Sequence, residues 1–383
     1  MRFSKFFLLL VTSLLVIILI SISSSPKEKV TRTPEEIYNQ ALKSTVLIKI
    51  SEVEDLNKSF SGTGSIVKFE FSEEPFILTA GHITEQIPTE KSDEYQAIFN
   101  YQRNPETLEC CMIDGDNFYA GLDFAVFRFK NDSAKNELGK FALPIGNSES
   151  LKTGDPIFII GTYEEANFIF NSGIVVHKQL VTIKHYRSES ILINTVFGFG
   201  SSGGPLINKY GELVGLNTSI YSNPNRNLGP NAVQPGSLYI SVPIDNIMEV
   251  INLFRLGEAG APPIYVSHPC VGQITFVNSW QMTDFELKTL GIDSRPEKSG
   301  VLVSGFMEIL SPATEVLRLG DRVISINNKK INNKVDAYRA IFMSFQRKVP
   351  VVIERDGEKM TVELKLVSFN DYQNSFFDIL DKE

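Results

Sequence analysis

Cysteine is scarce in this sequence. The chain of 383 residues contains three cysteines, Cys110, Cys111 and Cys270, which are too few for a disulfide framework. No two of them are spaced as Cys-x-x-Cys, and no cysteines and histidines cluster with the spacing of a zinc site. The sequence therefore argues against a disulfide-stapled scaffold, implies no metal and no other cofactor, and predicts free thiols.

Basic runs are also missing. The net charge is −8 at neutral pH, and no block of like charge forms a basic patch, which argues against a nucleic-acid partner. A hydrophobic content of 43% with 21% charged residues is typical of a globular protein. The length favours two domains rather than one.

One long apolar run is present, at residues 6–22, and Arg2 and Lys5 precede it. About 17–25 apolar residues span a bilayer, whereas a cleaved signal needs about 7–15. Positive charge before the run keeps the N-terminus in the cytoplasm and sends the remainder outward. We expect residues 1–22 to be a membrane anchor or signal. A retained anchor is favoured over cleavage at residues 21–23.

Strand signals dominate the chain after this run. Short apolar segments are separated by turn residues at uneven intervals, which favours an antiparallel barrel or sandwich. The β-helix-β alternation of an α/β fold is missing. The expected strands are residues 44–50, 62–67, 76–79, 122–129, 156–160, 173–176, 190–193, 205–207, 213–217 and 238–242.

The densest glycine cluster surrounds Ser202. Gly200 precedes this serine by two residues, and two glycines follow it directly. Such a loop can aim the amides of Gly200 and Ser202 at one oxygen, and each amide can stabilise an oxyanion by about 3 kcal/mol. We therefore interpret Ser202 as a nucleophile with these two amides as its oxyanion hole. The alternatives are a plain glycine-rich turn and the Gly-x-Ser-x-Gly elbow of an α/β-hydrolase.

A serine nucleophile needs a base within hydrogen-bond reach, and the chain has four histidines. His82 ends an apolar strand directly after a glycine, which would hold its side chain rigidly at a barrel rim. His177 and His185 lie in a polar stretch, residues 176–189, that we predict to be a surface loop. His268 lies beyond a proline-rich hinge. His82 is therefore the favoured base.

The third member of such a site is a carboxylate that orients the imidazole. Asp123 is a lone carboxylate at the start of an apolar strand, where burial is costly without a partner. Asp114 is predicted to be an ordinary turn residue. The order His82, Asp123, Ser202 is that of the chymotrypsin architecture, whereas an α/β-hydrolase would place its serine first. This order excludes the elbow interpretation.

Local signals divide the remainder of the chain. Thr33, followed by Pro34 and by Glu36 three positions on, predicts a helix start with a capping box. Asp356-Gly357 between two apolar segments predicts a hairpin. The resulting division is a tether at 23–34, a first unit at 35–257, a hinge at 258–263, a second unit at 264–368 and a tail at 369–383.

Taken together, these motifs resemble the HtrA-type (Deg) serine proteases with one C-terminal PDZ domain. Ser201 stands where that family usually has asparagine. The order of the matching segments is more specific than any one of them. The segments are residues 62–65, 78–82, 123–126, 143–146, 161, 172–175 and 200–205 in the first unit, and 300–303, 311–313 and 320–327 in the second.

The resemblance implies a mainly β fold, with a chymotrypsin-like double β-barrel followed by an α+β PDZ domain. It implies an ATP-independent serine endopeptidase with His82, Asp123 and Ser202 as its catalytic residues. Misfolded or regulatory proteins would be its substrates, in protein quality control or stress sensing of the cell envelope. The alternative from another functional class is a catalytically silent scaffold that only displays a peptide groove.

The PDZ resemblance also implies a groove for unfolded or C-terminal peptide segments, with Gly272, Ile274 and Ile341 as its expected binding residues. With one apolar N-terminal segment, the layout is similar to that of the membrane-anchored DegS-like members. Similarity to those members implies a homotrimer on the inner membrane, with the bulk of the protein facing the periplasm. If the N-terminal segment is cleaved, the protein is instead secreted.

Overall fold

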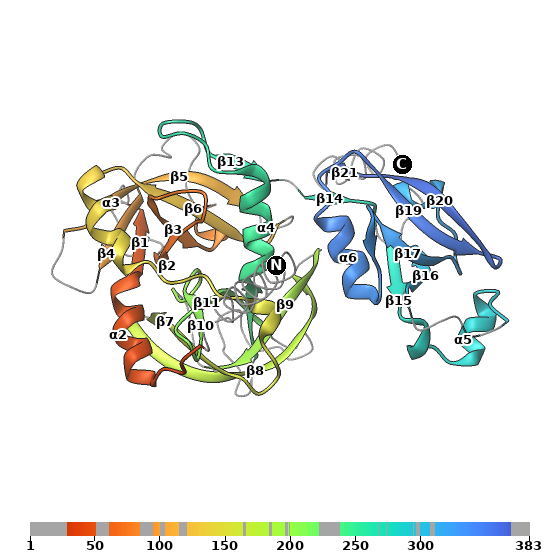
Figure 1. The fold of residues 1–383 in the computed structure, drawn as a ribbon, viewed down its shortest axis with the longest axis horizontal. Coiled ribbons are helices and arrows are strands. Elements are labelled where there is room, and N and C mark those ends of the chain that lie inside the picture. The colour runs from red at the N-terminus through yellow and green to blue at the C-terminus, as the bar shows by residue number, and fades with distance from the viewer. Residues whose placement is uncertain are drawn as a thin grey trace, which may run out of the picture.

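Two β-barrels and a separate smaller unit make up the fold (Figure 1). This is the mainly β, two-barrel architecture with a C-terminal α+β unit that the sequence predicts. The computed structural model describes residues 29–50, 61–84, 95–99, 104–114, 121–163, 166–183, 186–195, 198, 200–221, 238–266, 268–272, 274–293, 295, 299–306 and 311–368. The apolar segment 6–22 and the tail at 369–383 lie outside these residues. Among the described helices, none is long and apolar enough to cross a bilayer.

The first barrel is a sheet in the order β5-β4-β1-β2-β3-β6, and pairing of β5 with β6 closes it. A further strand, β13, runs parallel to β5. The predicted division placed this strand with the second unit, but its backbone bonds join it to the first barrel. The strands are β1 (Thr45–Ile50), β2 (Ser61–Lys68), β3 (Pro75–Thr79), β4 (Tyr95–Phe99), β5 (Glu106–Asp114), β6 (Phe124–Phe129) and β13 (Ile264–Val266).

The second barrel is closed in the order β10-β11-β12-β9-β8-β7. The prediction of a surface loop over residues 176–189 is wrong, because β8 and β9 continue through most of this stretch as a hairpin. Their register runs from Ile174 opposite Asn194 to Ile183 opposite Tyr186. The strands are β7 (Pro156–Tyr163), β8 (Ala166–Ile183), β9 (Tyr186–Asn194), β10 (Pro205–Asn208), β11 (Leu213–Tyr221) and β12 (Leu238–Pro243).

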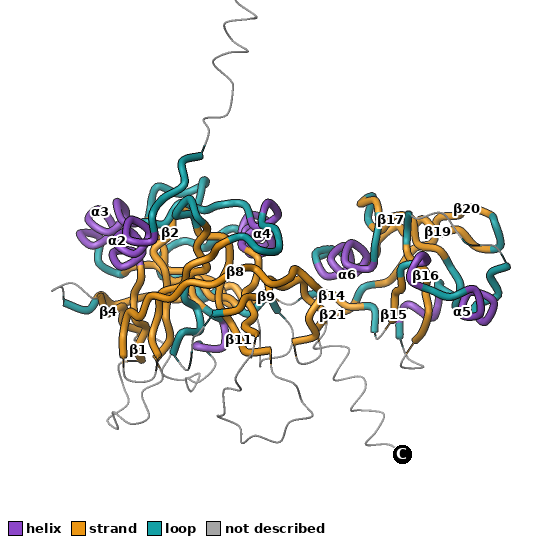
Figure 2. The backbone as a smooth tube through the Cα atoms, turned by 90° about the horizontal axis from the view of Figure 1, so that it is seen from below, coloured by secondary structure: helices purple, strands orange, loops and turns teal. Residues whose placement is uncertain are grey.

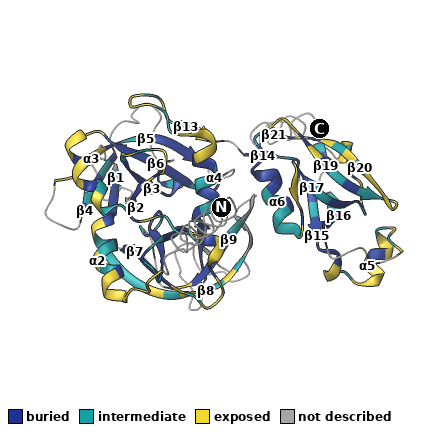
Figure 3. Cartoon of the chain, in the orientation of Figure 1, coloured by how far each residue is buried: buried dark blue, intermediate teal, exposed yellow. Residues whose placement is uncertain are grey.

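Apolar side chains fill both barrels, whose strands are largely buried in Figure 3. The helices α2 (Pro34–Ser44), α3 (Asp132–Leu138) and α4 (Ile244–Phe254) lie on the outside. The capping box predicted for α2 is confirmed: the Thr33 amide donates to Glu36 at 2.8 Å, and the Glu36 amide donates to the Thr33 hydroxyl at 3.2 Å. The three cysteines are free thiols, as predicted. Burial raises the pKa of the Cys111 thiol to about 11.

The second unit is built on a sheet in the order β15-β16-β17-β19-β20, with the short strand β18 paired to β17. The predicted turn at Asp356-Gly357 joins β19 to β20, and both residues have positive φ, 50° and 81°. The strands are β14 (Pro269–Cys270), β15 (Ile274–Val277), β16 (Val301–Phe306), β17 (Arg322–Ile326), β18 (Lys329–Lys330), β19 (Lys348–Arg355), β20 (Glu358–Lys365) and β21 (Val367–Ser368), and the helices are α5 (Asp284–Thr289) and α6 (Lys334–Phe342).

A buried ion pair joins the two units. Asp114 ends β5, and its carboxylate lies 2.8 Å from Nε2 of His268, with both side chains fully buried. The other ring nitrogen of His268 lies 3.1 Å from the carbonyl oxygen of Phe342, at the end of α6. The prediction that Asp114 is an ordinary turn residue is therefore wrong. In Figure 1 and Figure 2, α6 is the helix of the second unit that faces the barrels.

Candidate active site

His82 and Asp123 meet at one end of the first barrel. Strand β3 pairs with β6 so that Thr79 lies opposite Ala125, and His82 follows in the short 3-10 turn Gly81–Ile83. Nδ1 of His82 lies 2.8 Å from Oδ2 and 3.1 Å from Oδ1 of Asp123. The backbone amide of His82 also donates to Oδ1 at 2.8 Å. One carboxylate thus fixes both the backbone and the ring of the histidine.

This contact sets the tautomer of the imidazole. With a proton on Nδ1 facing Asp123, Nε2 is left to accept a proton. The side chains of His82 and Asp123 are 22% and 25% exposed, so substrate and water can reach them. Two backbone features accompany the approach of His82 to Asp123: the left-handed backbone of Asp123, and the close packing of Gly81, directly before His82, against β5. Asp123 has a φ of +60°, and a Cβ on Gly81 would lie 2.8 Å from the Asp114 carbonyl oxygen.

The Ser202 loop crosses from the second barrel onto the same end of the first. Gly203 has a φ of +82°, and a Cβ there would lie 2.2 Å from the Thr63 carbonyl oxygen and 2.7 Å from the amide nitrogen of Ala80. The Thr63 amide donates to the Ser202 carbonyl at 2.8 Å. Only a glycine permits this approach, which places Ser202 next to the segment that ends in His82. The Ser202 hydroxyl lies 3.4 Å from the Thr218 carbonyl oxygen, at the long end of hydrogen-bond distances.

The backbone before Ser202 forms a turn. The Ser201 amide donates to the Gly198 carbonyl at 3.1 Å, and Gly200 has a φ of +93°, in the region that favours glycine. The Gly200 carbonyl accepts a 2.7 Å hydrogen bond from the Thr63 hydroxyl. None of these bonds uses the amides of Gly200 and Ser202. The arrangement is compatible with the predicted oxyanion hole, which stays a prediction.

Comparison with known families and structures agrees with this geometry. Residues 62–216 match the model of the trypsin-like peptidase domain, and residues 289–366 match that of the PDZ domain. The chain thus combines a trypsin-like peptidase domain with a C-terminal PDZ domain, and it is similar to HtrA-type serine proteases. Similar proteins include the chloroplastic Protease Do-like 1 of Arabidopsis thaliana, 27% identical over 70% of this chain and 57% of that protein. The periplasmic serine endoprotease DegP of Salmonella typhimurium is 25% identical over 69% of this chain and 52% of its own length.

The chain spans about half the length of the curated relatives that it matches. Among solved structures, the HtrA-type protease AlgW with a tripeptide superposes with a TM-score of 0.63. The two chains are 19% identical, and the match covers 88% of this chain and 97% of AlgW. At that identity the match shows a shared fold.

Ser201, which departs from the pattern of the HtrA-type proteases that the chain resembles, has a structural place in this site. It is 5% exposed, and its hydroxyl donates to the carbonyl oxygen of Thr162. Thr63 is the residue that the sequence analysis did not single out, although it lies in the matching segment 62–65. Its hydroxyl and amide donate to carbonyl oxygens of the serine loop, and its carbonyl accepts a hydrogen bond from Thr79 of β3. Thr63 therefore joins the two barrels at the end that carries His82 and Asp123.

The predicted groove residues meet in the PDZ domain, but mostly in its core. Ile274 begins β15 and is 7% exposed, and Ile341 on α6 is 5% exposed. Both belong to the apolar cluster that also contains Phe276. Gly272 has a φ of +78°, and a Cβ there would lie 2.5 Å from the Ser311 hydroxyl. The structure thus brings strand and helix together as predicted, with little of the two isoleucines exposed.

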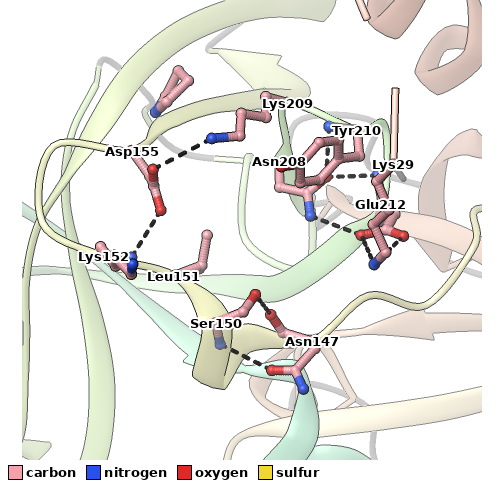
Figure 4. A pocket seen from close by; sticks show the side chains of 11 residues that line it. Lys29, Asn147, Ser150, Leu151, Lys152, Asp155, Asn208, Lys209, Tyr210 and Glu212 are labelled. Carbon is pink, nitrogen blue, oxygen red and sulfur yellow. Dashed lines mark hydrogen bonds and ion pairs between the residues drawn. The ribbon is translucent and has the colours of Figure 1, made fainter. Parts of the chain in front are cut away.

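A pocket of about 450 Å³ lies elsewhere, on the second barrel (Figure 4). It contains none of the three predicted catalytic residues. Its charged groups largely satisfy one another, because Lys29 pairs with Glu212 at 2.7 Å and Lys209 pairs with Asp155 at 3.7 Å. The candidate active site is therefore the cluster around His82, and not this pocket.

Proposed function

We propose that this protein is an ATP-independent serine endopeptidase that cleaves misfolded or regulatory proteins of the cell envelope. The observation that carries the proposal is the double contact of His82 with the Asp123 carboxylate, beside a glycine-flanked serine. That arrangement prepares an imidazole to act as a base. The side chain of His82 is 22% exposed, whereas the buried His268, which also contacts a carboxylate, is closed to substrate. The family match supports the same chemistry.

In the proposed reaction, the Ser202 hydroxyl attacks the scissile carbonyl of an extended substrate. Nε2 of His82 takes the serine proton and later gives it to the leaving amine, while Asp123 stabilises the charged imidazolium. The amides of Gly200 and Ser202 stabilise the oxyanion. A water molecule, which His82 deprotonates in turn, then hydrolyses the acyl-enzyme ester and restores the Ser202 hydroxyl.

We further propose that the PDZ domain recognises the apolar C-terminal segments of peptides and that this recognition raises protease activity. Contacts between the domains support such coupling. Arg339 of α6 lies 3.2 Å from Glu149 and 3.4 Å from Glu249 of the protease domain. A ligand that changes α6 therefore changes the border of the protease domain. A ligand can shift activity only through unequal affinity for the two states.

Casein cleavage tests the regulated protease. We expect measurable cleavage by the full-length protein and a higher rate with saturating decapeptides that end in apolar residues. The same peptides should increase labelling by a fluorophosphonate probe, which reacts only with an activated serine. An unchanged rate would reduce the PDZ domain to a substrate tether. Protein that neither cleaves nor labels would be a silent scaffold.

The proposal also includes assembly of the protein as a homotrimer. Light scattering measures the mass of the assembly in solution.

We also propose that residues 1–22 anchor the protein in the inner membrane, with its bulk in the periplasm. The apolar run 6–22 and the charges of Arg2 and Lys5 support this, and one relative carries the name of a periplasmic endoprotease. Carbonate washing of membranes should leave the protein in the pellet. A mature N-terminus near Ser23, measured by mass spectrometry, would instead show a cleaved signal and a secreted protein.

A further inference from the structure

Strand β15 is an edge strand of the PDZ sheet, because it is the terminal strand in the order and, within the part of the chain that the structure describes, pairs only with β16. The carbonyl of Thr275 faces β16, where it accepts a 3.2 Å hydrogen bond from Ser304. Backbone groups of successive residues in a strand point to opposite edges. The carbonyl of Ile274 and the amide of Phe276 therefore point away from the sheet, toward α6.

A single hydroxyl holds both of these outward groups. Tyr338 of α6 donates its phenolic proton to the Ile274 carbonyl at 3.2 Å. The same oxygen accepts a 3.0 Å hydrogen bond from the Phe276 amide. The phenol ring also packs edge-on against the ring of Phe276, with centroids 5.2 Å apart. One side chain thus satisfies the polar atoms at the centre of this edge.

These two atoms form the widely spaced pair of an antiparallel ladder. An antiparallel peptide added to the edge would donate one of its N–H groups to the Ile274 carbonyl. The peptide residue two positions earlier would accept a hydrogen bond from the Phe276 amide with its C=O group. A phenol supplies one donor and one acceptor, so the Tyr338 hydroxyl replaces both partners at once. The ligand strand and this hydroxyl cannot occupy the same two positions together.

We propose that Tyr338 closes the PDZ groove from within, as a competitor of the extended peptide, so that binding requires this side chain to leave β15. The inference rests on the peptide recognition proposed above and adds the residue that opposes it. The burial of Ile274 and Ile341 agrees with a closed groove. The residue after Tyr338 is Arg339, which contacts the protease domain, so a peptide that displaces Tyr338 acts on the helix at the domain border.

Peptide affinity tests the proposal in the full-length protein. The variant Tyr338→Phe keeps the ring and removes only the competing hydroxyl. We expect it to bind fluorescein-labelled decapeptides ending in Ala, Val, Leu or Phe roughly fivefold to tenfold more tightly than wild type, the effect of about one net hydrogen bond. Tyr210→Phe makes the same chemical change on the second barrel and should leave affinity unchanged. Fluorescence anisotropy measures all three proteins.

Hydrogen exchange tests the closed state without any peptide. The Phe276 amide should exchange at least tenfold faster in Tyr338→Phe than in wild type or Tyr210→Phe, because its acceptor is gone. Equal exchange rates would overturn the proposal. If wild type binds a peptide and Tyr338→Phe binds it equally or more weakly, the competitor is wrong and peptide recognition stands. If no peptide binds wild type or Tyr338→Phe, the proposed peptide recognition is wrong, because removal of the competing hydroxyl should have made binding easier to detect.

Discussion

Replacing Ser202 by alanine should abolish proteolysis while leaving the fold intact. Loss of a serine nucleophile that acts together with a histidine base lowers kcat on the order of a millionfold. Among the described residues, the Ser202 hydroxyl makes a single long hydrogen bond, 3.4 Å to the Thr218 carbonyl, so its removal should hardly change the free energy of unfolding. Casein cleavage and fluorophosphonate labelling measure the chemistry, and circular dichroism measures the fold.

The matched control for this variant is Ser172→Ala. Ser172 is an exposed serine on β8 of the same barrel, so the loss of its hydroxyl should change neither labelling nor cleavage. If the Ser202→Ala protein cleaves casein at the wild-type rate, the nucleophile is assigned to the wrong residue. The other two catalytic assignments would then lose their basis as well.

Replacing His268 by alanine should destabilise the protein by about 3–5 kcal/mol, the cost of removing one partner from a buried ion pair. The imidazole is fully buried, and its ring stacks on that of Phe342 with centroids 3.6 Å apart. Burial raises the pKa of the Asp114 carboxyl, whereas the neighbouring His268 opposes this rise. The variant would leave that carboxyl buried without its partner.

The pH dependence of the His268→Ala variant follows from the direction of this shift. A carboxyl whose pKa is raised by folding binds more protons in the folded than in the unfolded state, so its contribution to stability falls as pH rises above the unfolded pKa. The stability deficit should therefore be smaller at pH 5 than at pH 8. Guanidinium unfolding followed by circular dichroism measures it.

The control is His177→Ala, because His177 is exposed on β8 and its loss should have little effect on stability. The double variant Asp114→Asn with His268→Ala should lose less than His268→Ala alone, since no charge remains buried. A His268→Ala protein as stable as wild type at both pH values would show that the Asp114–His268 contact does not stabilise the fold.

Local rules in the sequence determined several elements of this protein. The capping box of α2 needs only Thr33 and Glu36, and the β19–β20 turn needs only Asp356-Gly357, since each depends on residues a few positions apart. The catalytic candidates were also accessible from sequence. Glycines around Ser202 and the chain order of the three residue types restrict the choice, because few backbones can present an exposed serine beside two amides.

Other features depend on partners distant in the chain, and only the tertiary structure decided them. The hairpin of β8 and β9 is held by backbone pairing that requires no burial pattern in the sequence, so a polar stretch concealed two strands. Asp114 resembles a turn residue until His268, 154 positions later, meets it in the core. Likewise, Tyr338 belongs to a helix with an apolar side, and only the packing of α6 on β15 places its hydroxyl on the two backbone groups that a peptide would need.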